Sequence, residues 1–94
     1  MNKYESNHMS IVASVGCVIC RRDMGIKVDC HVHHIGDGSS KRSNYRVAGL
    51  CELHHVGKLG IHGIGVKAFL RLFRLEKEEY LMDLVNEFRA IDGI

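Results

Sequence analysis

Apolar residues recur at helical spacing near the start of the chain. Within residues 4–15 they fall at Met9, Val12 and Ala13, and this pattern predicts a short amphipathic helix. Gly16 follows the last of these turns and is expected to end the helix, because glycine interrupts helical structure.

Strict alternation of apolar and polar residues replaces helical spacing in the middle of the chain. Residues 21–25 are polar and predict a turn, and residues 26–33 then alternate with a period of two, which indicates a half-buried strand. A glycine-rich loop at 36–43 separates this strand from a second apolar run, 45–50, which we expect to pair with it in antiparallel fashion. One face of the first strand would carry Ile26, Val28, Cys30 and Val32, and the other Lys27, Asp29, His31 and His33.

Helical spacing returns in the last third of the chain. Residues 51–58 predict a short helix, and the glycine-rich stretch 59–65 is expected to cross to a helical region at 66–91. A break near 74–76 would divide that region into two helices. Its large apolar side chains are expected in the core rather than in a ligand pocket: Phe69, Phe73, Leu81, Leu84 and Phe88.

Length and composition favour one small globular domain, residues 1–94, of the α+β class. A chain of 94 residues buries only a small core, so a metal ion that cross-links the chain is a reasonable expectation. The hydrophobic fraction of 46% and the charged fraction of 26% exclude a disordered chain. The predicted architecture is a two-stranded hairpin with an N-terminal helix and C-terminal helices.

The net charge of +2 is too small to indicate a nucleic-acid partner by itself. Its distribution is more informative, because Lys41, Arg42 and Arg46 lie in one short segment, far from the glutamates of 76–79.

No transmembrane run is apparent in the sequence. A secretory signal is not apparent either, since the first ten residues are too polar for its apolar segment. We therefore expect a cytoplasmic protein without membrane contact. In a reducing compartment, its four cysteines would be free thiols or metal ligands rather than disulfides.

Four of the metal-binding side chains have the spacing of a structural zinc site. Cys17 and Cys20 form a CxxC pair, and Cys51 and His54 form a CxxH pair on one face of a helix start, so all four can converge on tetrahedral zinc. A redox CxxC would need a βαβ context that is absent here, and buried inert thiols are the remaining alternative. Cys30 shares an apolar strand face and is expected to be a buried free thiol.

Histidine is the residue type most in excess. Six of the seven histidines lie between positions 31 and 62, and only His8 stands apart, with no expected role. Alternation places His31 and His33 on one strand face, roughly 7 Å apart. His55 directly follows a zinc ligand and must point elsewhere, which suits a second metal. Of the adjacent pair His33 and His34, one can bind a metal while the other takes a proton from water. The alternative is a set of polar surface residues or further structural zinc ligands.

The order of these motifs resembles the HNH (ββα-metal) endonucleases, and more narrowly the phage Ref (recombination enhancement function) group. The resemblance covers most of residues 8–73. It implies a zinc-stapled ββα-metal core. It rests on Cys17-Val18-Ile19-Cys20, His33-His34-Ile35, Asn44, Leu50-Cys51-Glu52-Leu53-His54-His55, Gly60-Ile61-His62-Gly63 and Lys67-Ala68-Phe69.

The resemblance implies a role for each matching residue. His34 would be the general base, and Asn44 would orient it. His33 and His55 would bind the catalytic metal, Mg²⁺ or Mn²⁺, although imidazole ligands also suit Zn²⁺. His62 could complete the shell of either metal.

The resemblance further implies DNA as substrate, a RecA filament as partner and a phage or prophage protein in a bacterial host cell. Lys41, Arg42 and Arg46 would then contact phosphates, or they would form an ordinary solvated loop.

Three functions compete. The first is a metal-dependent DNA endonuclease, the second a non-catalytic zinc-stapled module that binds DNA or protein, and the third a zinc-only structural or interaction protein. His34 and Asn44 favour the first, because only hydrolysis needs a base and a group to aim it.

Overall fold

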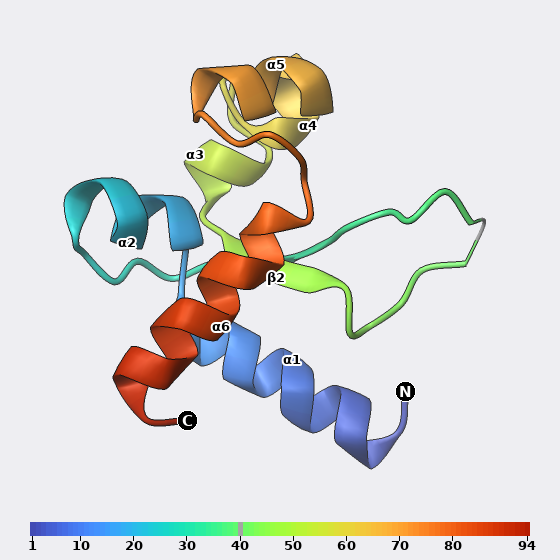
Figure 1. Ribbon diagram of the computed structural model, residues 1–94. Coiled ribbons are helices and arrows are strands. Elements are labelled where there is room, and N and C mark those ends of the chain that lie inside the picture. The colour runs from blue at the N-terminus through green and yellow to red at the C-terminus, as the bar shows by residue number, and fades with distance from the viewer. Residues whose placement is uncertain (40) are drawn as a thin grey trace.

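The computed structural model describes residues 1–39 and 41–94 and consists of a small hairpin surrounded by short helices (Figure 1). The two longest helices have 13 residues each, and none of the described helices is long and apolar enough to cross a membrane. The elements are α1 (Lys3–Val15), α2 (Val18–Met24), β1 (His31–His34), β2 (Val47–Leu50), α3 (Glu52–His55), α4 (Ile61–Ile64), α5 (Val66–Leu72) and α6 (Tyr80–Asp92).

The hairpin confirms the expected antiparallel pairing and the α+β class. β1 and β2 pair with His31 opposite Leu50 and His34 opposite Val47. The first strand is shorter than the predicted 26–33. Residues 26–30 lie outside the pairing, and in the middle of this segment the Val28 carbonyl accepts from the Cys17 amide, at 3.0 Å, instead of from β2.

The predicted turn at 21–25 is wrong, since most of it belongs to α2. Val18 and Ile19 are buried, while Arg21 and Arg22 follow on the outer side, so one turn of apolar residues is enough to anchor this helix. The helix ends only at Gly25, in the left-handed conformation with φ of 66°.

The C-terminal third follows the prediction with one addition. The 59–65 stretch contains a one-turn helix, α4, where only a crossing was expected. The break near 74–76 is confirmed, because α5 ends at Leu72 and α6 begins at Tyr80. The loop predicted at 36–43 lies between the strands, and one of its residues, Ser40, lies outside the described residues.

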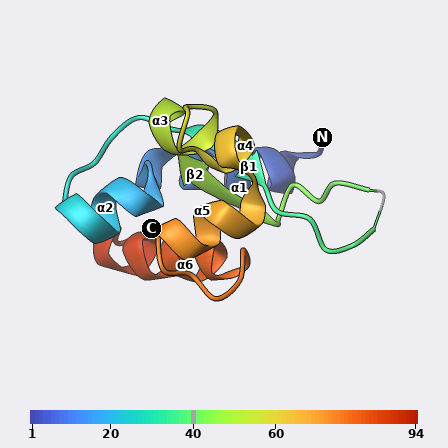
Figure 2. The same ribbon diagram turned by 90° about the horizontal axis from the view of Figure 1, so that it is seen from above.

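The hairpin lies among the helices, with α1 and α6 both packed against β2 and against each other (Figures 1 and 2). Because every residue of β2 except its glycine carries a buried side chain, this strand forms the centre of the core. The apolar side chains predicted for the core all belong to it, Phe69, Leu81 and Phe88 as buried residues and Phe73 and Leu84 at its margin.

Gly49 permits the close approach that brings β2 to the end of α1. A Cβ atom at this position would lie 2.5 Å from the Gly16 carbonyl oxygen and 2.6 Å from the Cys30 Sγ, both too close. The approach places Leu50 and Cys51 beside the segment that carries Cys17. Cys30 is half-buried rather than fully buried, and burial raises the pKa of its thiol to about 11.

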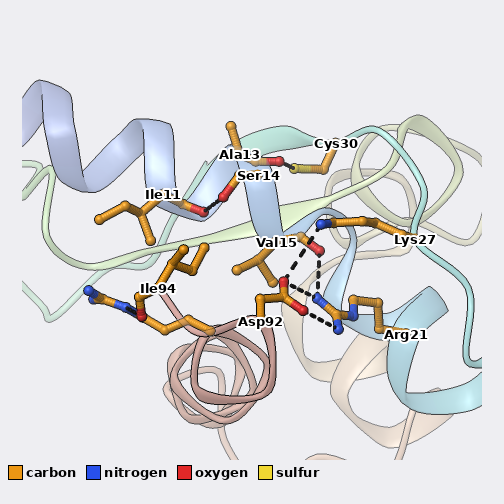
Figure 3. Close-up of polar contacts among 10 residues, drawn as sticks. Ile11, Ala13, Ser14, Val15, Arg21, Lys27, Cys30, Asp92 and Ile94 are labelled. Carbon is orange, nitrogen blue, oxygen red and sulfur yellow. Dashed lines mark hydrogen bonds and ion pairs between the residues drawn. The ribbon is translucent and has the colours of Figure 1, made fainter.

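An ion-pair cluster ties α2 to the ends of α1 and α6 (Figure 3). The Arg21 guanidinium donates to both carboxylate oxygens of Asp92, at 2.7 and 2.9 Å, and to the Val15 carbonyl at 3.3 Å. Lys27 Nζ lies 3.6 Å from the same carboxylate. Because α2 carries Cys20, this cluster also fixes one side of the predicted zinc site.

The first turn of α1 is closed by a capping box. The Glu5 amide donates to Asn2 Oδ1 at 2.8 Å, and the Asn2 amide donates to Glu5 Oε1 at 3.2 Å. This end of α1 lies on the side of the molecule from which the loop between the strands projects, as both ribbon views show. Glu5 is therefore close to the residues that precede β2.

Candidate metal and catalytic site

The four side chains predicted as zinc ligands converge at the junction of α2, β2 and α3. The Sγ atoms of Cys17, Cys20 and Cys51 and one ring nitrogen of His54 all lie within 4.8 Å of one another. Tetrahedral zinc with Zn–S bonds of about 2.3 Å places sulfurs about 3.8 Å apart, and Cys20 and Cys51 are separated by 3.8 Å. His54 Nδ1 lies 3.5, 3.6 and 3.1 Å from the three sulfurs. The donor set and its spacing fit zinc.

All four of these residues are buried, so a cation has to compensate their charge when the thiols ionise. Burial raises the pKa of the Cys17 thiol and raises that of Cys20 to about 12, where the neighbouring sulfurs of Cys17 and Cys51 add to the effect. Burial also lowers the pKa of His54 and keeps its ring neutral. A metal-free cluster would therefore bury neutral, poorly bonded polar groups, whereas zinc binding would hold the thiolates.

A second group of possible metal ligands lies next to the first. One ring nitrogen each from His33, His55 and His62 lies within 4.8 Å of the others, and the ring centroids are 4.7 to 5.3 Å apart. His33 is buried, His55 is half-buried and His62 is exposed, so the group opens to solvent on one side. Three nitrogen ligands with an open side are the arrangement of catalytic rather than structural metal sites.

Two rings of this group, those of His33 and His55, favour the neutral form that binds metals. Burial, with the nearby rings of His33, His62 and His31, lowers the pKa of His55 to about 4. Burial also lowers the pKa of His33, although a carboxylate opposes this effect. Lone pairs of these two rings are therefore available at neutral pH without a deprotonation cost.

That carboxylate belongs to Glu78, which reaches the group from the connection between α5 and α6. Its Oε2 accepts from His33 Nε2 at 2.7 Å, and His33 is only 3% exposed. A hydrogen bond at Nε2 leaves the lone pair of the ring on Nδ1. A carboxylate behind a histidine is the common way to orient a metal ligand and raise its basicity.

His34 makes a separate set of contacts at the end of β1. Its Nε2 lies 2.9 Å from Asn44 Oδ1, and the Asn44 amide nitrogen donates to Glu5 Oε2 at 2.8 Å. The other ring nitrogen, Nδ1, accepts from the Arg42 guanidinium at 2.6 Å. The structure therefore places the predicted base, His34, and its predicted orienting residue, Asn44, in direct contact.

An open cleft of about 420 Å³ lies between His34 and the second group of possible metal ligands. Its lining includes the second metal group and His34, together with Lys41 and Arg42 from the loop between the strands. Arg46, the third predicted phosphate contact, does not line this cleft. Its guanidinium donates to the carbonyls of Ile35 and Gly36 and to Glu79, so it stabilises the base of the loop.

Three residues near the site were not assigned to it from the sequence. His31 Nδ1 lies 2.9 Å from His55 Nδ1, and only strand alternation hinted at this. Glu78 gave no local signal, because its approach to His33 depends on how the C-terminal helices pack. Glu5 could be recognised only as a helix-capping residue. His8, expected to have no role, packs against the Tyr45 ring, with centroids 5.6 Å apart.

Comparison with known families gives a match over most of the chain. The family model described as "Recombination enhancement, RecA-dependent nuclease" matches residues 3–83. That range includes every residue of both metal groups as well as His34, Asn44, Glu5 and Glu78. No curated protein and no solved structure matches the chain.

Proposed function

The chain belongs to the family of recombination-enhancement, RecA-dependent nucleases, and from that premise we propose that it is a metal-dependent DNA endonuclease of the HNH type. The observation that carries this proposal is the cleft shared by His34 and three imidazoles that could hold a metal ion. A general base next to an open metal group is what phosphodiester hydrolysis requires. A module that only binds needs neither.

In the proposed reaction, His34 Nδ1 takes a proton from a water molecule as its oxygen attacks a DNA phosphorus. The bond between that phosphorus and the 3′ oxygen breaks, and the departing oxygen takes a proton from solvent. Asn44 holds the opposite side of the ring, because its Oδ1 accepts from Nε2 at 2.9 Å. The base therefore presents a lone pair on the nitrogen away from Asn44.

A divalent ion held by His33, His55 and His62 would supply charge stabilisation for the phosphate and the departing oxygen. The three rings suit Zn²⁺ as well as Mn²⁺, whereas Mg²⁺ prefers oxygen ligands and would depend more on water. The zinc group of Cys17 and its partners would have a purely structural role.

Lys41 and Arg42 are the cations in position to hold substrate. Both line the cleft, and Arg42 contacts the His34 nitrogen that the water would need. A phosphate attracts a guanidinium more strongly than a neutral imidazole does. We propose that Arg42 moves from His34 to a phosphate oxygen as DNA binds, which frees the base.

The function is tested by a plasmid-nicking assay on zinc-loaded protein, with Mg²⁺ or Mn²⁺, in the presence and absence of a RecA-coated strand. We expect cleavage that depends on the added metal and rises with the RecA filament. Such a filament would also explain how a chain with a net charge of +2 reaches its substrate. No cleavage by folded, zinc-loaded protein under any of these conditions would favour the zinc-stapled binding module instead.

Glu78 provides a test of the second metal group that does not depend on cleavage. Glu78→Gln removes the carboxylate behind His33, so we expect the affinity of this group for Zn²⁺ or Mn²⁺ to fall about 10- to 100-fold. Calorimetric titration of protein whose structural site is already filled measures the change.

Glu79→Gln is the matched control, because it removes the same charge from the adjacent position, where the carboxylate faces Arg46 at 3.4 Å instead. Its metal affinity should equal that of the wild type. Equal affinities for the two variants and the wild type would show that the His33–Glu78 contact has no part in metal binding.

A further inference from the structure

A chain of hydrogen bonds runs from the first turn of α1 to His34. Glu5 Oε2 accepts from the Asn44 side-chain amide at 2.8 Å, and Asn44 Oδ1 contacts His34 Nε2 at 2.9 Å. The other oxygen of Glu5 accepts from the Asn2 backbone amide at 3.2 Å. A residue that caps a helix thus also contacts the amide that touches the proposed base.

The direction of every bond in this chain is fixed by Glu5. An ionised carboxylate can only accept hydrogen bonds, and both of its oxygens are used. Donation from Asn44 and Asn2 lowers the pKa of Glu5, so it is ionised at neutral pH. The Asn44 amide must therefore turn its NH₂ group to Glu5 and its oxygen to His34.

The orientation of Asn44 favours one nitrogen of His34 as the proton carrier, and the Arg42 guanidinium, which donates to Nδ1 at 2.6 Å, favours the same form until it leaves the ring. An amide oxygen accepts, so His34 Nε2 must be the donor and Nδ1 must hold the lone pair. If the amide were reversed, its NH₂ group would face Nε2, and the ring proton would move to Nδ1 once Arg42 has left that nitrogen. The nitrogen that faces the cleft cations would then be unable to accept a proton from water.

We propose that Glu5 is a positioning residue that sets the tautomer of His34 through Asn44. The inference deepens the proposed function, since the value of this tautomer rests on His34 acting as the base. It assigns the N-terminal helix a part in the site, beyond its packing against the hairpin. On this proposal, the Glu5 carboxylate both caps α1 and orients the Asn44 amide next to His34.

The test is the tautomer of His34 in zinc-loaded protein, read from ¹⁵N chemical shifts of labelled histidine rings at about pH 8.5, where imidazoles are neutral. His34→Ala identifies the signal by its loss. We expect the Nε2–H form in the wild type. Both proteins, the wild type and Glu5→Gln, are measured in an Arg42→Ala background, because the Arg42 guanidinium otherwise holds Nδ1 as an acceptor. In Glu5→Gln the new amide must turn its NH₂ group either to the Asn2 amide or to Asn44, so we expect the Nδ1–H form to become populated.

A second variant separates the tautomer from any damage to the helix. In the double variant Glu5→Gln with Asn44→Asp, the amide at position 5 donates to the carboxylate at position 44, which again accepts from His34 Nε2. We expect the wild-type tautomer to return. Asn2→Ala weakens the same helix cap but keeps Glu5 and Asn44, so it should leave the tautomer unchanged.

Cleavage rates provide the second readout. We expect Glu5→Gln to lower kcat about 10- to 100-fold, as the loss of an orienting partner typically does, with partial recovery in the double variant. An unchanged His34 tautomer in Glu5→Gln, or an Nδ1–H form in the wild type, would overturn the inference. A tautomer that shifts as described in a wild type that never cleaves DNA would leave the inference standing and overturn the nuclease proposal.

Discussion

Removal of zinc by a strong chelator should unfold most of the chain. The Cys17, Cys20, Cys51 and His54 cluster joins α2 to the end of β2 and to α3, and all four residues are buried in or beside the core. Structural zinc supplies about 10–16 kcal/mol of apparent binding free energy in small zinc-folded peptides. A whole domain is stable by only about 5–15 kcal/mol. The free energy lost with the zinc should therefore exceed the stability that the remaining hydrophobic core provides.

Far-ultraviolet circular dichroism during chelation, followed by addition of zinc, measures this effect. We expect helical signal to fall on chelation and to return with one equivalent of zinc. Chelated protein that still melts cooperatively at the original temperature would contradict a structural role for the cluster.

Two cysteine variants sharpen the experiment. Cys51→Ser removes a ligand and should give a protein that loses zinc and helical structure together. Cys30→Ser makes the same chemical change at a half-buried thiol outside the cluster, with its Sγ 3.8 Å from the Ala13 carbonyl. This control should keep its zinc and most of its stability.

The second large effect is expected from His34→Ala. A positioned general base contributes about 10²- to 10⁴-fold to the rate, so we expect kcat to fall by that amount. His34 is only half-buried at the end of β1, and its contacts are to Asn44 and Arg42 rather than to the core. The fold and the zinc content should therefore survive the change.

Nicking rates under RecA-supplemented conditions measure the loss, with zinc content and circular dichroism recorded on the same samples. His8→Ala is the control, because it removes a histidine that contacts Tyr45 and lies in neither metal group. Full activity in His34→Ala would exclude His34 as the base, and loss of zinc or structure would assign it to the folding of the domain.

Local patterns predicted the fold well where one element decides its own structure. The capped helix α1, the antiparallel hairpin and the break between α5 and α6 all agree with periodicity and glycine positions. The wrong predictions occur where contacts with distant residues override the local pattern of apolar and polar residues. The alternation of 26–33 continues past the strand, because Cys17 rather than β2 binds the Val28 backbone. Residues 21–24 are helical because buried Val18 and Ile19 anchor the helix before them, and Asp92, 71 residues away from Arg21, contacts this polar segment.

For the candidate site, too, the local spacing of residues predicted part of the arrangement. Short spacings identified both pairs of the zinc cluster, since two intervening residues bring ligands together without help from the rest of the chain. Strand alternation also brought His31 and His33 to one side, where both rings contact His55. The roles proposed for His34, Asn44 and the second metal group remain predictions until the variants are measured.

The sequence alone indicated which side chains are proposed to carry the chemistry, because ligand type and spacing are properties of the chain. Only the tertiary structure decided which carboxylates form hydrogen bonds with these side chains. Glu5 reaches Asn44 across 39 positions and Glu78 reaches His33 across 45. Contacts at such separations follow from how α1, the hairpin and α6 pack around β2, and packing of this kind leaves no periodic signal in the sequence.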